Sequence, residues 1–148
     1  MSGQSPSGLY NQDTFYKDFV KDLQNVRTMV IIESPFITKK RMQQLFPILE
    51  KLRAKNIRVI VNTKPFDEHE IIYQEQAVWA VGMMQDIGID VLFTSGHHRK
   101  LAIIDDILWE GSLNILSQNN SCEIMRRTKS AEIVGQMINF TGLKRWCK

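Results

Sequence analysis

Residues 98–114 read HRKLAIIDDILWEGSLN, and this stretch sets the architecture that the rest of the chain has to fit. Two short segments rich in apolar residues, 100–104 and 107–109, are separated only by Asp105 and Asp106. A spacing this short predicts two antiparallel strands joined by a tight turn. The polar residues at the two ends of the stretch should therefore lie close together.

His98 and Lys100 are two residues apart, so on an extended strand their side chains point to the same side. An imidazole and an ammonium placed in this way can meet one phosphate together. Ser112 and Asn114 have the same spacing on the neighbouring strand, and we expect the two pairs to converge at one end of the sheet. Asp105 has the opposite parity to His98, so we expect it to brace the turn or a neighbouring basic group.

Glu123 lies on a further predicted strand, 122–125. It is the better placed carboxylate to hold the Nδ1 hydrogen of His98, which would leave Nε2 facing a substrate.

Upstream, helical periodicity alternates with short apolar runs. We predict helices over 13–27, 38–52, 67–88 and 131–146, and strands over 29–32, 57–61 and 89–93. Alternating strands and helices indicate an α/β fold with a mixed, largely parallel β-sheet flanked by helices.

The length of 148 residues suits one domain, which we place at 13–148 after a flexible N-terminal lead-in over 1–12. The net charge of +3 is compatible with a nucleic-acid partner. Cys122 and Cys147 have no metal-site or disulfide spacing. There is no secretory signal and no run of roughly 20 apolar residues. We therefore expect a cytoplasmic protein without metal, cofactor or membrane contact.

The H-x-K-x4-D pattern of His98, Lys100 and Asp105, followed by the G-S-x-N segment at 111–114, resembles the phospholipase D superfamily. The order of predicted elements from 13 to 146 looks like one complete catalytic half of that family. The segment 120–123 is similar to an Asn and Glu stretch of its minimal bacterial nucleases. The interval between Asp105 and Gly111 is one residue shorter than the usual pattern.

The resemblance implies phosphodiester cleavage in two steps without metal. His98 would attack phosphorus to give a phosphohistidine, and His98 of a second copy would protonate the leaving oxygen. Lys100, Ser112 and Asn114 would hold the non-bridging oxygens. The family builds its site from two motifs and this chain has one. One imidazole also cannot act on both sides of the same phosphorus, so we predict a homodimer.

Among substrates we favour nucleic acid, with DNA ahead of RNA, and hence an endonuclease. The segment 31–37 resembles one in single-motif domains attached to helicases and other DNA-processing ATPases, so the chain would also suit a module of a larger protein. Two alternatives stay open. One is a phospholipase D-type lipid phosphodiesterase, and the other is a dimeric DNA-binding module that uses the phosphate pocket for docking.

Three further residues, His97, His69 and Phe36, have interpretations outside the reaction itself. His97 is expected as an exposed residue at a loop end, with substrate contact as the alternative, and His69 as a surface residue. Phe36 would pack either on a base or as an anchor of its own loop.

Overall fold

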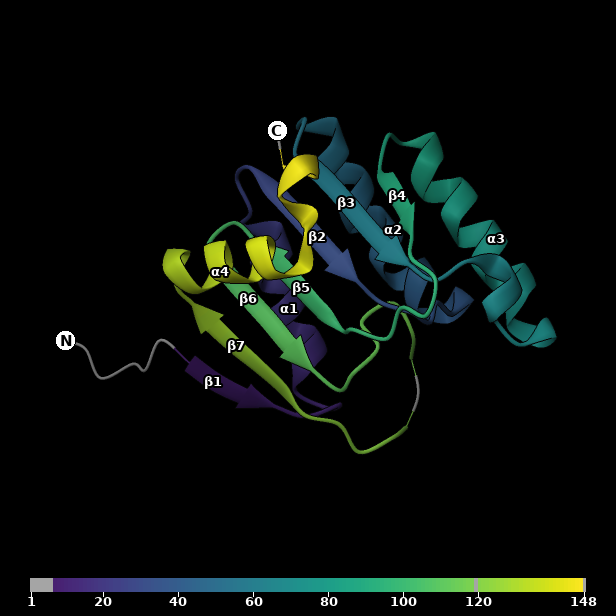
Figure 1. Cartoon of the computed structure of the whole chain (residues 1–148), viewed down its shortest axis with the longest axis horizontal. Coiled ribbons are helices and arrows are strands. Elements are labelled where there is room, and N and C mark those ends of the chain that lie inside the picture. Colours follow the sequence, from purple (N-terminus) through teal and green to yellow (C-terminus); the bar gives the residue numbers. More distant parts are fainter. Residues whose placement is uncertain (1–6, 119, 148) are drawn as a thin grey trace.

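The computed structural model describes residues 7–118 and 120–147 as one β-sheet with helices on both faces (Figure 1). In chain order the elements are β1 (Ser7–Tyr10), α1 (Phe15–Gln24), β2 (Met29–Glu33), α2 (Lys39–Ala54), β3 (Arg58–Thr63), η1 (Phe66–Glu68), α3 (Ile71–Asp86), β4 (Asp90–Phe93), β5 (Leu101–Ile104), β6 (Ile107–Gly111), β7 (Met125–Lys129), α4 (Ala131–Thr141) and η2 (Leu143–Trp146), where η marks a 3-10 helix. The seven strands lie in the order β1-β7-β6-β5-β2-β3-β4.

The mixed α/β architecture is confirmed, but the parallel part of the sheet is smaller than expected. Over the described ranges, β2 pairs with β3 and β3 with β4 in parallel. The other four pairings are antiparallel. The predicted hairpin is present, with Ile104 opposite Ile107 across the turn. After β1, which pairs antiparallel with β7, the chain forms the parallel strands β2, β3 and β4 and then the antiparallel strands β5, β6 and β7, of which β5 pairs with β2.

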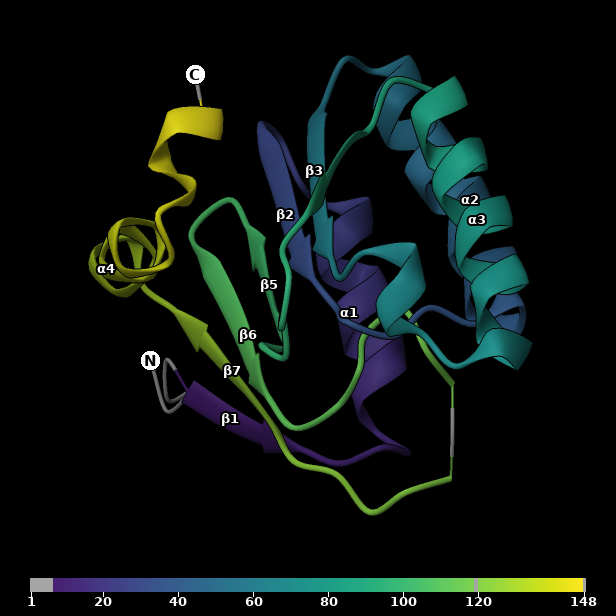
Figure 2. The same ribbon diagram turned by 45° about the vertical axis from the view of Figure 1, so that its right-hand side comes forward.

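Two hydrophobic layers hold the sheet between its helices. Helices α1, α2 and α3 cover one face, and α4 with η2 covers part of the other (Figure 2). The strands alternate accordingly: Val30 and Ile32 of β2 face the first layer, whereas Ile31 faces the second. Both faces of the central strands are therefore buried, which accounts for their continuous apolar runs.

Several boundaries differ from the predicted ones. Residues 7–10, which we placed in the flexible lead-in, form β1 and pair with β7, while residues 1–6 lie outside the described residues. Strand β7 begins at Met125, where the predicted strand 122–125 ends. The last predicted helix is divided at Gly142, which has a φ of 74°. The third helix begins at Ile71 after a separate 3-10 turn.

Gly111 allows β6 to approach the chain at 124–125 closely. A Cβ atom added at Gly111 would collide with the carbonyl oxygen of Ile124 and would lie 2.9 Å from Met125 Cα. The Gly111 amide also donates to the Lys100 carbonyl oxygen at 3.3 Å. A side chain here would push apart the strand ends beside the predicted polar residues.

We expect Gly111→Ala to lower the free energy of unfolding by about 1–3 kcal/mol, because backbone atoms must move to make room. Gly135→Ala is the matched control: it lies in α4 with open space around the new Cβ, and alanine favours a helix. Chemical denaturation of both variants tests this. Equal stability of Gly111→Ala and the wild type would contradict the close approach.

Candidate active site

His98, Lys100, Ser112 and Asn114 lie at the end of the sheet where β2, β3 and β4 finish and β5 begins. His98 and Lys100 belong to the segment 94–100 that links β4 to β5, so neither is inside a strand. Ser112 and Asn114 come after the end of β6 and are likewise outside a strand, although we expected them within one. The strand ends still bring these segments together. Ligands of open α/β sheets bind at this carboxyl end of the parallel strands.

The segment 94–100 is tied down at its start by Glu68 of η1. The Glu68 carboxylate accepts hydrogen bonds from the Ser95 hydroxyl and the Gly96 amide, both at 2.8 Å. These hydrogen bonds lower the pKa of Glu68, and the bond from the Gly96 amide has the largest effect. Gly96 has a φ of 71°, a conformation that glycine adopts without strain.

Arg99 binds Glu33 at the end of β2. Its Nε and Nη2 atoms each lie 2.8 Å from a carboxylate oxygen, and this bidentate bond raises the pKa of Arg99. The Glu33 side chain is 0% exposed, whereas that of Arg99 is 43% exposed. Asn62 of β3 donates to the same carboxylate at 2.8 Å and accepts a hydrogen bond from the Thr94 hydroxyl at 2.9 Å. The network joins the ends of two strands to the segment that carries the motif.

His98 and Lys100, on either side of Arg99, contact each other. Lys100 Nζ lies 2.9 Å from His98 Nδ1 and 2.8 Å from the His98 carbonyl oxygen. Burial lowers the pKa of Lys100; the Glu123 carboxylate acts in the opposite direction and Lys64 adds to the lowering. A protonated lysine only donates, so Nδ1 is the acceptor in this contact. A neutral His98 ring then carries its hydrogen on Nε2.

Glu123 lies near this pair without bonding to His98. Its carboxylate influences Lys100 electrostatically, and its backbone amide donates to the Gln12 side chain at 2.9 Å. In the described part of the chain His98 Nδ1 contacts Lys100, so the pairing of Glu123 with Nδ1 stays a prediction.

Ser112 and Asn114 occupy the neighbouring loop. The Ser112 hydroxyl accepts a hydrogen bond from the Ile124 amide at 3.0 Å and so holds this loop against β7. Asn114 is half-buried, and its Oδ1 atom has no partner within residues 7–118 and 120–147. Their contact with phosphate oxygens stays a prediction.

A small cavity of about 270 Å³ opens beside Asn114. Phe36 and Tyr73 provide its aromatic walls. The Lys64 ammonium lies 3.9 Å from the centre of the Phe36 ring, and the same ammonium influences Lys100. Lys64 thus lies against one aromatic wall of this cavity and within electrostatic range of Lys100, the residue that contacts His98.

Two histidines that we expected at the surface are buried. His97 is 5% exposed and His69 is 4% exposed, and burial is the main cause that lowers the pKa of each. The expectation is wrong because the segments that carry them pack on each other through the bonds of Glu68 to Ser95 and Gly96. Burial thus favours the uncharged form of both rings.

Asp105 lies at the opposite end of β5 from His98. Its carboxylate accepts hydrogen bonds from the Arg27 amide at 2.8 Å, the Thr28 amide at 3.0 Å, the Thr28 hydroxyl at 2.6 Å and the Met29 amide at 3.2 Å. The expected bracing role is confirmed: Asp105 fixes the β5–β6 turn to the start of β2.

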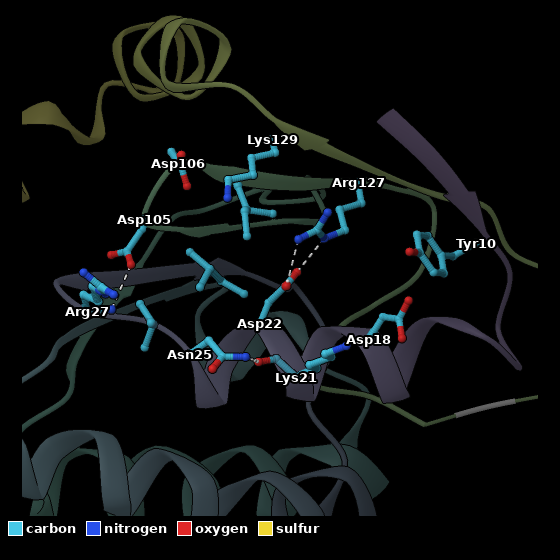
Figure 3. A pocket seen from close by; sticks show the side chains of 13 residues that line it. Tyr10, Asp18, Lys21, Asp22, Asn25, Arg27, Asp105, Asp106, Arg127 and Lys129 are labelled. Atoms are coloured by element: carbon cyan, nitrogen blue, oxygen red, sulfur yellow. Dashed lines mark hydrogen bonds and ion pairs between the residues drawn. The ribbon is translucent and has the colours of Figure 1, made fainter. Parts of the chain in front are cut away.

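Asp105 also borders a cavity of about 760 Å³ between α1 and this turn (Figure 3). Its charged lining residues balance, with Lys21, Arg27, Arg127 and Lys129 against Asp18, Asp22, Asp105 and Asp106. Arg127 turns onto Asp22 in a bidentate ion pair, at 2.8 and 2.9 Å. This cavity offers a phosphate no excess of positive charge, in contrast to the end of the sheet that carries His98.

The sequence did not reveal Glu33, Asn62 and Glu68 as parts of the site. Glu33 had a usable signal, because a charged residue directly after an apolar strand run needs a partner when it is buried. Asn62 and Glu68 had no comparable signal.

The substitution Asp105→Asn distinguishes a structural role of this residue, which would affect stability, from a catalytic role, which would affect activity. Burial raises the pKa of Asp105, but the hydrogen bonds from 27–29 outweigh it and the net pKa is lowered. The ionised carboxylate thus contributes stability above its unfolded pKa, and this is lost as the pH falls through the folded pKa. We expect the variant to lose about 1–3 kcal/mol at neutral pH and less in acid.

Thermal unfolding against pH measures this effect, with Asp106→Asn as the neighbouring control. Asparagine tolerates the φ of 51° at position 105, so the turn is preserved. Any phosphodiesterase activity per folded molecule should stay within a few-fold of the wild type. A loss of about 10²-fold in a fully folded variant would instead assign Asp105 to the reaction.

Within the described residues, no helix has the length and apolar character that a membrane crossing requires. The same residues contain no group of three or more His, Cys, Asp or Glu side chains arranged to hold a metal ion.

No family model matches the sequence, and no curated protein matches it. Solved structures do match. NucT from Helicobacter pylori is 17% identical, with a TM-score of 0.76 over 95% of this chain and 96% of that one. Nuc from Salmonella typhimurium, a phospholipase D family member, is 12% identical, with a TM-score of 0.72 over 95% of each chain.

The phosphatidylserine synthase of Haemophilus influenzae Rd KW20 is 12% identical, with a TM-score of 0.74, and the match covers 95% of this chain but 37% of the synthase chain. The two Nuc-type chains are therefore matched over nearly their whole length, and the synthase over part of its length. The chain has a phospholipase D-like fold.

Proposed function

We propose that the chain is a metal-independent phosphodiesterase, an endonuclease that cleaves nucleic acid through a phosphohistidine at a site shared by two copies. The observation that carries this proposal is the contact of Lys100 with His98 at the carboxyl end of the parallel strands. The His98 side chain is exposed there, beside an ammonium that attracts phosphate.

In the first step, Nε2 of His98 attacks phosphorus and forms an N–P bond. The bond from phosphorus to the leaving oxygen breaks, and that oxygen takes a proton from the second copy's His98, which starts as an imidazolium and becomes a neutral imidazole. In the second step, water attacks phosphorus and the N–P bond breaks. The second imidazole takes the proton of the water, which releases a phosphate monoester and restores both rings.

The site needs two copies because the attacking and leaving groups lie on opposite sides of phosphorus. A single ring on one side cannot reach the leaving oxygen. A two-fold axis that places the two exposed His98 rings face to face supplies both groups from identical chains.

The remaining residues stabilise charge and position the rings. Lys100 of each copy, with Ser112 and Asn114, holds the non-bridging oxygens as negative charge develops. Glu123, whose charge already influences Lys100, accepts the Nδ1 hydrogen of the ring that attacks.

Nucleic acid is the substrate that the surroundings favour. Phe36 and Tyr73 line the cavity beside Asn114, and Lys64 lies over Phe36. Aromatic side chains next to cations suit bases and phosphates of a single strand. The net charge of +3 has the sign that such a partner requires, and DNA is the first substrate to test.

A lipid phosphodiesterase is the second candidate. Ile71 and Ile72, at the start of α3, are 85% and 70% exposed, and Phe93 at the end of β4 is 43% exposed. Exposed apolar side chains at this end of the sheet suit contact with acyl chains. The fold likeness to a phosphatidylserine synthase is consistent with this candidate.

His98→Asn tests the function directly. We expect the wild type to cut DNA in the presence of EDTA and the variant to lose this activity, because asparagine forms no phosphoryl intermediate. The assay includes plasmid, single-stranded DNA, RNA and phosphatidylcholine vesicles. Light scattering should give a dimer for both proteins. The His98 side chain is exposed, so its substitution removes no contact from the core and leaves the fold unchanged.

Each outcome of that assay selects one function. Lipid turnover without DNA cleavage supports the second candidate. Salt-sensitive DNA binding without any turnover supports a docking module. Cleavage that survives His98→Asn, or an active monomer, refutes the shared histidine site.

The lowered pKa of Lys100 predicts a decline in rate at alkaline pH, because the deprotonated amine no longer stabilises the developing charge. Lys100→Arg should move this decline to higher pH, since arginine stays charged. Profiles of kcat/KM from about pH 7 to about pH 10.5 measure the shift. Lys51→Arg, on an exposed part of α2, is the control. If kcat/KM declines at the same pH in Lys100→Arg and in Lys51→Arg, Lys100 is not the group whose deprotonation causes the decline.

A further inference from the structure

We propose that Arg99 is a positioning residue: its guanidinium, clamped on buried Glu33, fixes the direction in which His98 and Lys100 face. The inference rests on the proposed function and assigns a role to the residue that the H-x-K pattern leaves open. It starts from the order of the three side chains along 98–100. The central one binds inside the protein, and the two outer ones meet each other at the substrate side.

The clamp fixes orientation as well as distance. Arg99 uses Nε and Nη2 on the two separate oxygens of Glu33, each at 2.8 Å. A planar guanidinium that is bound at two points has a fixed orientation, whereas a lysine ammonium bound at one point can still rotate. Arg99 faces Glu33 while its two neighbours contact each other away from that carboxylate, so fixing Arg99 also limits the directions open to His98 and Lys100.

The other half of the clamp is part of the sheet. Glu33 lies opposite Asn62 in β3 and opposite Leu101 in β5, the residue directly after Lys100. The amide of Asn62 holds one oxygen of the carboxylate in addition. The anchor is therefore held by the sheet and not by the loop, and its partner Leu101 is the residue next to Lys100 and three residues after His98.

The clamp also keeps the loop in place. A carboxylate that is 0% exposed needs a charged or hydrogen-bonding partner, so releasing Arg99 leaves a buried charge without its cation. The bonds of Glu68 reach only as far as Gly96. Between that point and β5, the buried ring of His97 and the hydrogen bonds of Arg99 to Glu33 tie the segment to the body of the protein.

A purely structural ion pair predicts that activity returns whenever stability returns, whereas a positioning role predicts that it does not. Arg99→Met leaves Glu33 without its cation and should lower Tm by roughly 10 °C. Glu33→Gln combined with Arg99→Met removes both charges and keeps an acceptor for Asn62. We expect this double variant to regain most of the lost Tm, because a neutral pair replaces an unpaired charge.

Kinetics on a small chromogenic phosphodiester, bis(p-nitrophenyl) phosphate, provide the decisive comparison. We expect kcat of the double variant to stay about 10²-fold below the wild type, because a displacement of about 1 Å has such an effect, with a smaller change in KM. Arg99→Lys retains the charge without the fork and should restore Tm but only part of kcat. Arg126→Met, on an exposed part of β7, is the control. Wild-type kcat in the double variant or in Arg99→Lys would overturn the positioning role.

A measurement that needs no activity separates this inference from the proposed function. Backbone NMR order parameters for residues 97–100 should fall from the rigid range, about 0.85, to about 0.6 or below in the double variant. Rigid values there would overturn the role of Arg99 even in an active enzyme. A wild type that cleaves no phosphodiester, together with the expected fall in order parameters, would refute the proposed function and leave the clamp intact.

Discussion

The buried ion pair of Glu33 with Arg99 is the constraint on which the candidate site depends. A carboxylate at the end of β2, shielded from water by the sheet around it, is unfavourable unless its charge is met. The segment between β4 and β5 supplies the guanidinium, and in doing so it has to run across the ends of β2 and β3. The strand order β5-β2-β3-β4 already takes the loop that carries His98 across these strand ends, and the buried carboxylate of Glu33 fixes it there.

Ser34, the residue directly after Glu33, holds the other loop of the site, the one after β6 that carries Ser112 and Asn114. Ser34 is fully buried, and its hydroxyl accepts a hydrogen bond from the Leu116 amide at 3.1 Å. Thr38 completes the contact: its amide donates to the Leu116 carbonyl oxygen at 2.9 Å, and its hydroxyl accepts from the Gln118 amide at 3.0 Å. Glu33 at the end of β2 and Ser34 directly after it thus hold the two loops that carry His98, Lys100, Ser112 and Asn114. Both loops are therefore fixed at this edge of the sheet.

Local spacing was enough to predict the parts of the structure that depend on neighbours in the chain. The β5–β6 hairpin and the bracing position of Asp105 follow from the Asp105-Asp106 turn and from strand parity. The burial of His97 does not, since it depends on how separate loops pack. The partner of Arg99 is 66 residues away, and no periodicity links them. Sequence reasoning therefore located the side chains that we propose to react, but not the ion pair of Arg99 with Glu33 beside them.

The contact between Lys100 and His98 also bears on how two identical chains could divide the work. With Nδ1 accepting from Lys100, the neutral ring keeps its hydrogen on Nε2, whereas a ring that protonates the leaving oxygen has to be an imidazolium with hydrogens on both nitrogens. An attacking ring needs the opposite tautomer, with Nδ1 donating to a carboxylate such as Glu123. The two copies of the proposed site must therefore differ in protonation at the moment of reaction. Both reacting rings carry a hydrogen on Nδ1, so Lys100 has to release that nitrogen in each copy. A half-buried lysine with a lowered pKa, close to the Glu123 charge, is suited to leave this contact and turn its ammonium to the phosphate oxygens.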